Sequence, residues 1–176
     1  MKFTQVLTLG MVLGSAVASP SFQKRDAKPL IDALTTISKT TQALTTSVSA
    51  FTGDAAEGAK ILTQAEGLLK VLDDATASLG PLAVLPLNEA VQVLAPGNVL
   101  IADVTKVTDT LISKKDAFVK NSLGSVVGET LSKFKVSAEK LVGVITQKLP
   151  PNVASVGATI GKQINASLDK GIAAFK

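Results

Sequence analysis

The chain has 176 residues and a mass of 18.0 kDa, which leaves room for one domain of ordinary size. It contains no His, Cys, Trp or Tyr, so a Ser-His-Asp triad, a cysteine nucleophile, a structural zinc site and haem ligation by His or Cys are excluded. Hydrophobic residues make up 46% of the chain, aromatic residues only 3%, and the mean hydropathy is +0.37, so we expect a folded domain with an aliphatic core.

The first 25 residues have the pattern of a secretory leader. Lys2 precedes an apolar run that is too short to cross a membrane, for which about 20 apolar residues are needed. Small residues ending at Ala18 supply a cleavage site, and Lys24-Arg25 supplies a dibasic site of the kind cut in the secretory pathway. We therefore predict a signal peptide over residues 1–18, a short propeptide over 19–25 and a secreted domain over 26–176.

Removal of the leader changes the charge of the chain. It takes Lys2, Lys24 and Arg25 from the 18 basic residues and leaves 15 against 14 acidic ones, a net charge of +1. The remaining domain has no Arg, Tyr or Trp, whereas nucleic-acid binding usually needs a basic patch with stacking side chains. We expect no nucleic-acid partner, no cofactor and no transmembrane span.

Apolar residues of the mature domain recur at spacings of three and four, which is typical of amphipathic helices. A first helix is predicted over residues 27–51, with Thr41 interrupting its apolar stripe. A second helix follows Asp54, whose carboxylate can cap it together with Glu57, and Gly80-Pro81 ends it. The predicted inward positions of this second helix are Leu62, Ala65, Leu69, Leu72 and Leu79.

The stretch between Pro81 and Pro96 is apolar and contains one short helix over residues 88–94. Longer helices are predicted over residues 98–121 and 125–149, and a final one, capped by Asn152, continues to the end of the chain with Val156 among its inward residues. The fold class is therefore all-α, an antiparallel bundle of about five long amphipathic helices. A core of thin aliphatic side chains either closes tightly or leaves an elongated apolar cavity, and the pattern does not distinguish the two.

No constellation of residues indicates catalysis. Ser-x-x-Lys spacing occurs at Ser132, Ser137 and Ser167, but the further Ser-Asp-Asn and Lys-Thr-Gly elements of the corresponding enzymes are missing. The adjacent carboxylates Asp73 and Asp74 point about 100° apart on a helix and do not converge as an acid/base pair. We expect a protein that is not an enzyme and has no metal site.

Several features together resemble the fungal family of hydrophobic surface binding protein A and the related cell wall galactomannoproteins. They are the leader ending at Lys24-Arg25, the Cys-free helical domain of about 150 residues, Ile31-Asp32-Ala33-Leu34 and the segment 114–118. The resemblance implies secretion or cell-wall association, adsorption to hydrophobic surfaces and, in some members, enclosure of long-chain fatty acids. It brings no catalytic residues. The larger wall members carry a Ser/Thr-rich tail and a lipid-anchor signal, whereas this sequence stops at Lys176, which favours a freely secreted protein.

Our leading hypothesis is a secreted helical bundle that binds apolar material, either a fatty-acyl chain in its interior or a hydrophobic surface, where a secreted hydrolase could be recruited. Hydroxyls beside the inward stripes either contact a ligand headgroup or bond back to their own helix; the candidates are Thr41 and Ser137. The candidate apolar contacts are Leu34, Ile37, Leu69, Leu111, Phe118, Leu131, Phe134 and Ile145.

The alternative hypothesis is a structural wall mannoprotein whose glycans carry its interactions. It predicts O-mannosylation of the threonines in the first helix, Thr35, Thr36, Thr40 and Thr41. An N-glycosylation sequon is also present at Asn165.

Overall fold

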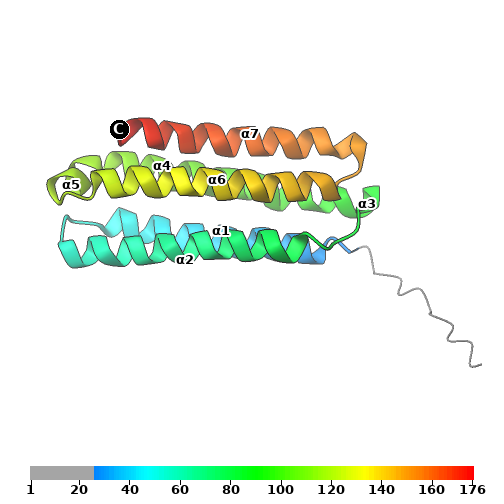
Figure 1. The fold of residues 1–176 in the computed structure, drawn as a ribbon, viewed down its shortest axis with the longest axis horizontal. Helices are drawn as coiled ribbons and strands as arrows, with labels where there is room; N and C mark the ends of the chain where they lie inside the picture. Colours follow the sequence, from blue (N-terminus) through cyan, green and yellow to red (C-terminus); the bar gives the residue numbers. More distant parts are fainter. Residues whose placement is uncertain (1–25) are drawn as a thin grey trace, which may run out of the picture.

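The computed structural model describes residues 26–176, so the predicted leader, with its processing residues Ala18, Lys24 and Arg25, lies outside the described part. The described residues form helices and contain no strand. Five helices are long, and the elements are α1 (Lys28–Ala50), α2 (Ala55–Leu79), α3 (Leu87–Ala90), the 3₁₀-helix η1 (Val91–Val93), α4 (Leu94–Ser113), α5 (Lys115–Lys120), α6 (Gly124–Lys148) and α7 (Pro151–Ala174) (Figure 1). The prediction of an all-α bundle with five long helices is confirmed.

The start of α2 shows how local sequence sets a helix boundary. The Asp54 carboxylate accepts hydrogen bonds from the backbone N–H groups of Ala56 (2.8 Å) and Glu57 (3.1 Å), which are two of the unsatisfied donors at a helix N-terminus. The Glu57 carboxylate accepts from the backbone N–H of Thr52 at 3.0 Å rather than from Asp54. The predicted N-terminal capping of α2 by Asp54 is therefore present, but the Glu57 side chain bonds to Thr52 instead of to Asp54.

Three helix boundaries differ from the sequence prediction. Helix α4 begins at Leu94, ahead of Pro96, because a proline in the first turn removes no hydrogen bond that the helix needs. The helix predicted over 98–121 is interrupted at Lys114 (φ −100°, ψ 5°), and α5 continues after the break. The final helix begins at Pro151, and Asn152 does not cap it.

The five long helices form a closed ring. Helix α1 packs against α2 and α4, α2 against α6, α6 against α7, and α7 against α4. Successive long helices run in opposite directions, as predicted (Figure 1). A ring of five cannot alternate throughout, and in this one three pairs of neighbours run in the same direction: α1 and α4, α4 and α7, and α2 and α6. Pairs that follow one another in the chain, α1 with α2 and α6 with α7, are antiparallel.

Polar contacts fix two of the parallel pairs. Between α1 and α4, the buried Asp103 carboxylate accepts hydrogen bonds from the Ser38 hydroxyl and from the Gln42 amide at 3.0 and 3.1 Å. A buried carboxylate is costly unless it is hydrogen-bonded, so this cluster favours one alignment of the two helices.

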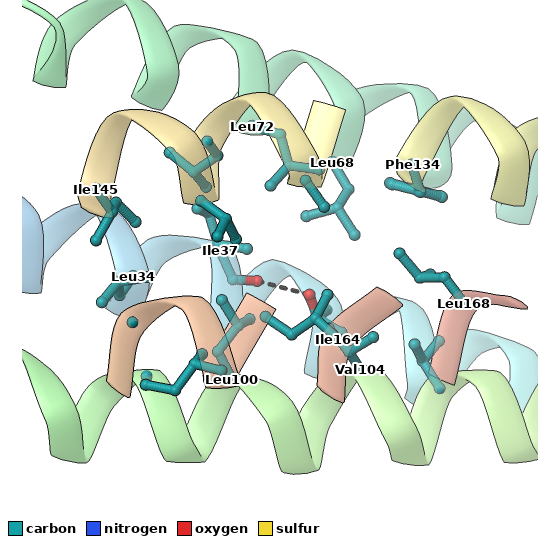
Figure 2. A pocket seen from close by; sticks show the side chains of 18 of the residues that line it. Leu34, Ile37, Leu68, Leu72, Leu100, Val104, Phe134, Ile145, Ile164 and Leu168 are labelled. Atoms are coloured by element: carbon teal, nitrogen blue, oxygen red, sulfur yellow. Dashed lines mark hydrogen bonds between the residues drawn. The ribbon is translucent and has the colours of Figure 1, made fainter. Parts of the chain in front are cut away.

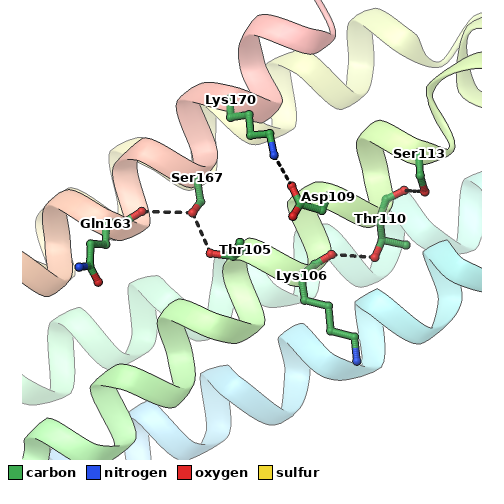
Figure 3. A network of polar contacts seen from close by, with 8 residues as sticks. All are labelled: Thr105, Lys106, Asp109, Thr110, Ser113, Gln163, Ser167 and Lys170. Carbon is green, nitrogen blue, oxygen red and sulfur yellow. Dashed lines mark hydrogen bonds and ion pairs between the residues drawn. The ribbon is translucent and has the colours of Figure 1, made fainter.

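A second set of polar contacts lies on the outside of α4 and α7 (Figure 3). The Thr105 and Ser167 hydroxyls are 2.9 Å apart, and Lys170 Nζ lies 2.7 Å from Asp109 Oδ1. Both partners of the ion pair are at least half exposed, so the pair contributes little to stability and mainly selects the register of the two helices.

The buried faces of α2 and α7 differ in detail from the predicted stripes. On α2, Ile61 and Leu68 are buried, whereas the predicted Leu62 and Leu69 are only half-buried. On α7, Val156 is 41% exposed, and glycines occupy inward positions of that helix. A Cβ atom at Gly161 would lie only 2.5 Å from Val142 Cγ1, so this glycine lets α7 approach α6 closely.

Three of the four phenylalanines in the described chain close one end of the ring. Phe51 and Phe118 are stacked with ring centroids 4.4 Å apart, and Phe175 meets Phe118 edge-on at 6.3 Å. All three are buried, and we call them the aromatic plug. Residues 80–93, which comprise a loop, α3 and η1, cover the opposite end, and we call them the cap. Among residues 26–176 no helix is long and apolar enough to cross a bilayer.

Candidate functional site

The ring of helices surrounds an apolar cavity that extends from the cap end toward the aromatic plug. Figure 2 shows side chains of all five long helices converging on it, including Leu34, Leu68, Leu100, Phe134 and Ile164. A five-membered ring leaves space along its axis that only side chains can fill. Because these side chains are mostly Leu, Val and Ile, the space is not completely filled.

The free volume of this cavity is about 90 Å³. For comparison, an engineered apolar cavity of about 150 Å³ stays dry and binds benzene. The closed cavity is therefore too small for a long acyl chain, and such a ligand would have to displace side chains and separate helices. The wall is uniformly apolar, so an entering hydrocarbon would lose no hydrogen bond to it.

Thr41 is the only residue with a polar side chain among the 24 described residues that line the cavity. Its hydroxyl donates a 2.8 Å hydrogen bond to the backbone oxygen of Ile37, one turn earlier in α1. It is 2% exposed. The oxygen can still accept a hydrogen bond from a ligand, but no lysine lines the cavity and none is placed to pair with a buried carboxylate. The chemistry of the site therefore suits a hydrocarbon chain far better than a charged group.

Seven of the ten residues selected from the sequence line this cavity. They are Leu34, Ile37, Thr41, Leu111, Leu131, Phe134 and Ile145. They come from α1, α4 and α6, and side chains from α2 and α7 complete the wall. Whether they contact a ligand stays a prediction.

The other three selected residues lie outside the cavity. Leu69 and Ser137 belong to a shallow groove on the outer side of α2 and α6, where the Ser137 hydroxyl donates a 3.0 Å hydrogen bond to Asp73. Phe118 is part of the aromatic plug. Leu69 is displaced because Leu68 occupies the inward position of that turn, and Phe118 because the break at Lys114 places it on α5.

Sequence reasoning left several wall residues unselected. Leu100, Val104, Ile160, Ile164 and Leu168 lie in predicted amphipathic helices, but nothing in the spacing of apolar residues indicates which of them face a void. Leu68, Val93 and Leu94 were on no predicted stripe and line the cavity too. On α2, alternating spacings of four and three residues would have identified Leu68 as an inward residue. The buried residues that follow this spacing are Ile61, Ala65, Leu68, Leu72, Ala75 and Leu79.

The candidate glycosylation sites fall in different environments. Thr35 and Thr36 are exposed, Thr40 is partly exposed, and Thr41 is buried in the cavity wall, so it is inaccessible in the folded domain. Asn165 is half-buried in the middle of α7, and its amide Nδ2 lies 3.2 Å from Glu139 Oε1 on α6. Glycan attachment at any of these positions stays a prediction.

The geometry defines a class of protein: a closed helical bundle with an interior site whose described wall is apolar except for Thr41. The chain matches the family "Hydrophobic surface binding protein A" over residues 27–147 and belongs to it. The resemblance inferred from the sequence is therefore confirmed.

The alignments with curated relatives cover the whole of this chain. Cell wall mannoprotein 1 of Aspergillus fumigatus is 31% identical over 177 residues, covering 100% of this chain and 61% of that protein. Cell wall mannoprotein 1 of Aspergillus flavus is 27% identical over 176 residues, covering 100% of this chain and 63% of that protein. The chain thus spans about three fifths of the length of these relatives.

Solved structures share the fold. Ligand binding domain 1 of Penicillium marneffei MP1 protein, complexed with arachidonic acids, has a TM-score of 0.83 and 26% identity, covering 86% of this chain and 99% of that one. AFMP4P in complex with palmitic acid also has a TM-score of 0.83, with 86% of this chain and 100% of that chain covered. Its identity of 23% supports the fold alone.

Proposed function

We propose that this chain is a secreted, non-enzymatic protein that binds one long-chain fatty acid, or a similar acyl chain, in the cavity enclosed by its five long helices. The observation that carries the proposal is the continuous apolar wall, to which every long helix contributes and in which Thr41 has the only polar side chain among residues 26–176. The arachidonic acids in the related MP1 domain, which is 26% identical, support the same ligand class.

Binding in this bundle requires expansion. The closed cavity of about 90 Å³ cannot hold an acyl chain, so the ring must open as the ligand enters. Movement of helices is feasible because the core contains few large aromatic side chains and because the helix contacts are made by short aliphatic groups. An association rate well below the diffusion limit is expected, since a conformational step must accompany entry.

The ligand's carboxylate is proposed to stay near the protein surface while the chain fills the cavity. A carboxylate buried in the described wall would lose its hydration without a cation to replace it. The Thr41 hydroxyl already donates its proton to the Ile37 oxygen, so it can donate to a ligand's carboxylate only by giving up that hydrogen bond.

Native mass spectrometry of the secreted protein, followed by solvent extraction and lipid identification, tests the proposal. One fatty acid per folded chain, released by extraction and rebound on addition of palmitic acid, is the expected result. A protein that is empty as secreted and binds no added fatty acid would overturn the proposal. The variant V136Q, which changes an exposed residue on the outside of α6 that does not line the cavity, should bind palmitic acid like the unsubstituted protein.

A structural wall mannoprotein is the second candidate, favoured by the names of the curated relatives. Exposed Thr35 and Thr36 on α1 are the positions where mannosylation is proposed. Glycan analysis of secreted protein separates the two candidates, because dense O-mannosylation with an empty cavity would support wall structure alone. Recruitment of a secreted hydrolase also stays a prediction, tested by co-sedimentation of the hydrolase with coated particles.

A further inference from the structure

The cap exposes an unusual amount of apolar side chain. Val84, Leu87 and Val91 are 51%, 49% and 46% exposed, and Leu87 and Val91 are four residues apart on the same side of the α3–η1 turn. The opposite side of this segment, with Ala90 and Val93, is buried against the bundle. The cap therefore presents apolar groups both inward and outward. Isolated exposed valines are ordinary, but a local group of this kind marks an interaction surface.

The same end of the molecule is poor in charge. Residues 80–102 contain one charged side chain, Glu89, and residues 149–161 contain none. Both segments lie at the cap end, on the right in Figure 1, where α4 and α7 begin. Glu89 is already engaged, because its carboxylate accepts from the backbone N–H of Ala27 at 3.2 Å. The exposed Val99 and Val156, in the second turns of α4 and α7, extend the apolar surface around this end.

Charged side chains gather at the other end. The loop after α1 and the start of α2 carry Asp54 and Glu57, and the break between α4 and α5 carries Lys114 and Lys115. The lysines nearest the cap are held by partners: Lys28 lies 2.6 Å from Asp32, and Lys148 Nζ donates to the Gly80 oxygen at 2.6 Å. Lys28 and Asp32 are 71% and 60% exposed, so the start of α1 keeps an exposed ion pair at the cap end. The low density of charge is therefore a property of the cap and of the starts of α4 and α7, and these are the parts of this end that cost least to dehydrate.

The apolar end is also the end that the cavity reaches. Val93 of the cap lines the cavity together with Leu94 and Leu149, whereas no residue of the aromatic plug lines it. Outside its helical turns, the cap is joined to α6 by the hydrogen bonds that Lys148 makes with it, one of them from the Leu85 N–H to the Lys148 oxygen at 2.8 Å. The bond between Glu89 and the Ala27 N–H is a further link, to the start of α1, and Leu85, Ala90 and Val93 are buried, so moving the cap breaks few hydrogen bonds but exposes these three side chains.

We propose that the cap end docks on the surface of a lipid assembly, with the axis of the bundle directed into the lipid, and that the acyl chain passes between lipid and cavity beneath the cap. This inference rests on the proposed fatty-acid binding. Val84, Leu87 and Val91 would enter the apolar layer, and the charged plug end would stay in water. Docking in this orientation lets the acyl chain move without crossing water.

The test compares two double variants of the full secreted chain. V84Q/V91Q changes two cap valines that are 51% and 46% exposed, and V119Q/V136Q changes two valines away from the cap that are 53% and 51% exposed. The chemistry and the exposure are matched, so an effect of lost apolar surface in general would appear in both. The probe is phosphatidylcholine vesicles carrying palmitic acid, with binding measured by flotation and transfer measured by the rate at which the protein acquires palmitic acid.

We expect V84Q/V91Q to lower the vesicle partition coefficient about tenfold and to slow transfer in proportion, while V119Q/V136Q stays close to the unsubstituted protein. Binding of palmitic acid added in free solution should be unchanged in both variants. Equal loss in both variants, or no loss in either, would overturn the cap assignment. Failure of the unsubstituted protein to bind palmitic acid in free solution would instead refute the proposed function.

The same variants also test two other binding partners for the exposed surface of the cap, a hydrophobic solid and a second copy of the chain. Adsorption to polystyrene without vesicle binding would replace the lipid by a hydrophobic solid and overturn the proposal. A dimer seen by analytical ultracentrifugation, and abolished by V84Q/V91Q, would assign the surface to a second copy of the chain and overturn it too.

Discussion

Two buried phenylalanines allow the aromatic plug and the cavity to be tested separately. Phe118 is fully buried, stacked on Phe51 and edge-on to Phe175. Phe134 is 8% exposed and lines the cavity. Replacing either residue by alanine removes the same atoms, so a difference in the response to ligand must come from where the ring lies.

The two substitutions are both expected to lower stability without ligand, F118A more than F134A. Phe→Ala in a core lowers the free energy of unfolding by about 3–5 kcal/mol. F118A should fall at the upper end, because two ring contacts of about 0.5–1.5 kcal/mol each are lost as well. F134A should fall at the lower end, because its ring borders space that is already unfilled. An acyl chain can occupy the volume that F134A vacates, but it does not reach the plug.

Urea unfolding with and without palmitic acid measures the difference. A ligand at about 100 times its dissociation constant stabilises the folded state by about 2.7 kcal/mol. F118A should show the same ligand-induced increase as the unsubstituted protein, and F134A a larger one. If both variants lose the ligand response equally, the plug and the cavity act as one unit and the reasoning fails. F118L and F134L repeat the comparison if an alanine variant does not fold.

Three further predictions concern stability. G161A should lower the free energy of unfolding by about 1–2 kcal/mol, because the new Cβ meets a valine methyl on α6 at 2.5 Å. G67A, whose new Cβ has no atom within 4 Å, should raise the free energy of unfolding by up to about 1 kcal/mol, and thermal melts compare the two variants. D103A should cost about 1–3 kcal/mol in urea by leaving its α1 donors unpaired, and an unchanged midpoint would contradict this. The hydrogen bond from Lys135 to Asp169 raises the pKa of Lys135 above 10.5, so its contribution is present below pH 10.5 and lost above it; the difference between the unsubstituted protein and K135Q should vanish only in that alkaline range.

Much of the secondary structure could be predicted because it depends on neighbouring residues. The spacing of apolar positions identified the long helices, Asp54 identified the start of α2, and Pro150-Pro151 separated α6 from α7. Errors arose where two adjacent positions were equally apolar. Leu68 and Leu69 illustrate this, since only packing against the neighbouring helices selects which of them faces inward.

The sequence by itself determined that the domain is helical, that its core is aliphatic, and that it has none of the His- or Cys-based catalytic machinery. Those properties follow from composition and from the 3.6-residue period, which act locally. Only the tertiary structure decided that five helices close into a ring, that Phe118 seals one end while Phe134 borders a void, and that Val84, Leu87 and Val91 of the cap stay exposed. An apolar stripe specifies which face of a helix avoids water, but what that face meets depends on helices far away in the chain.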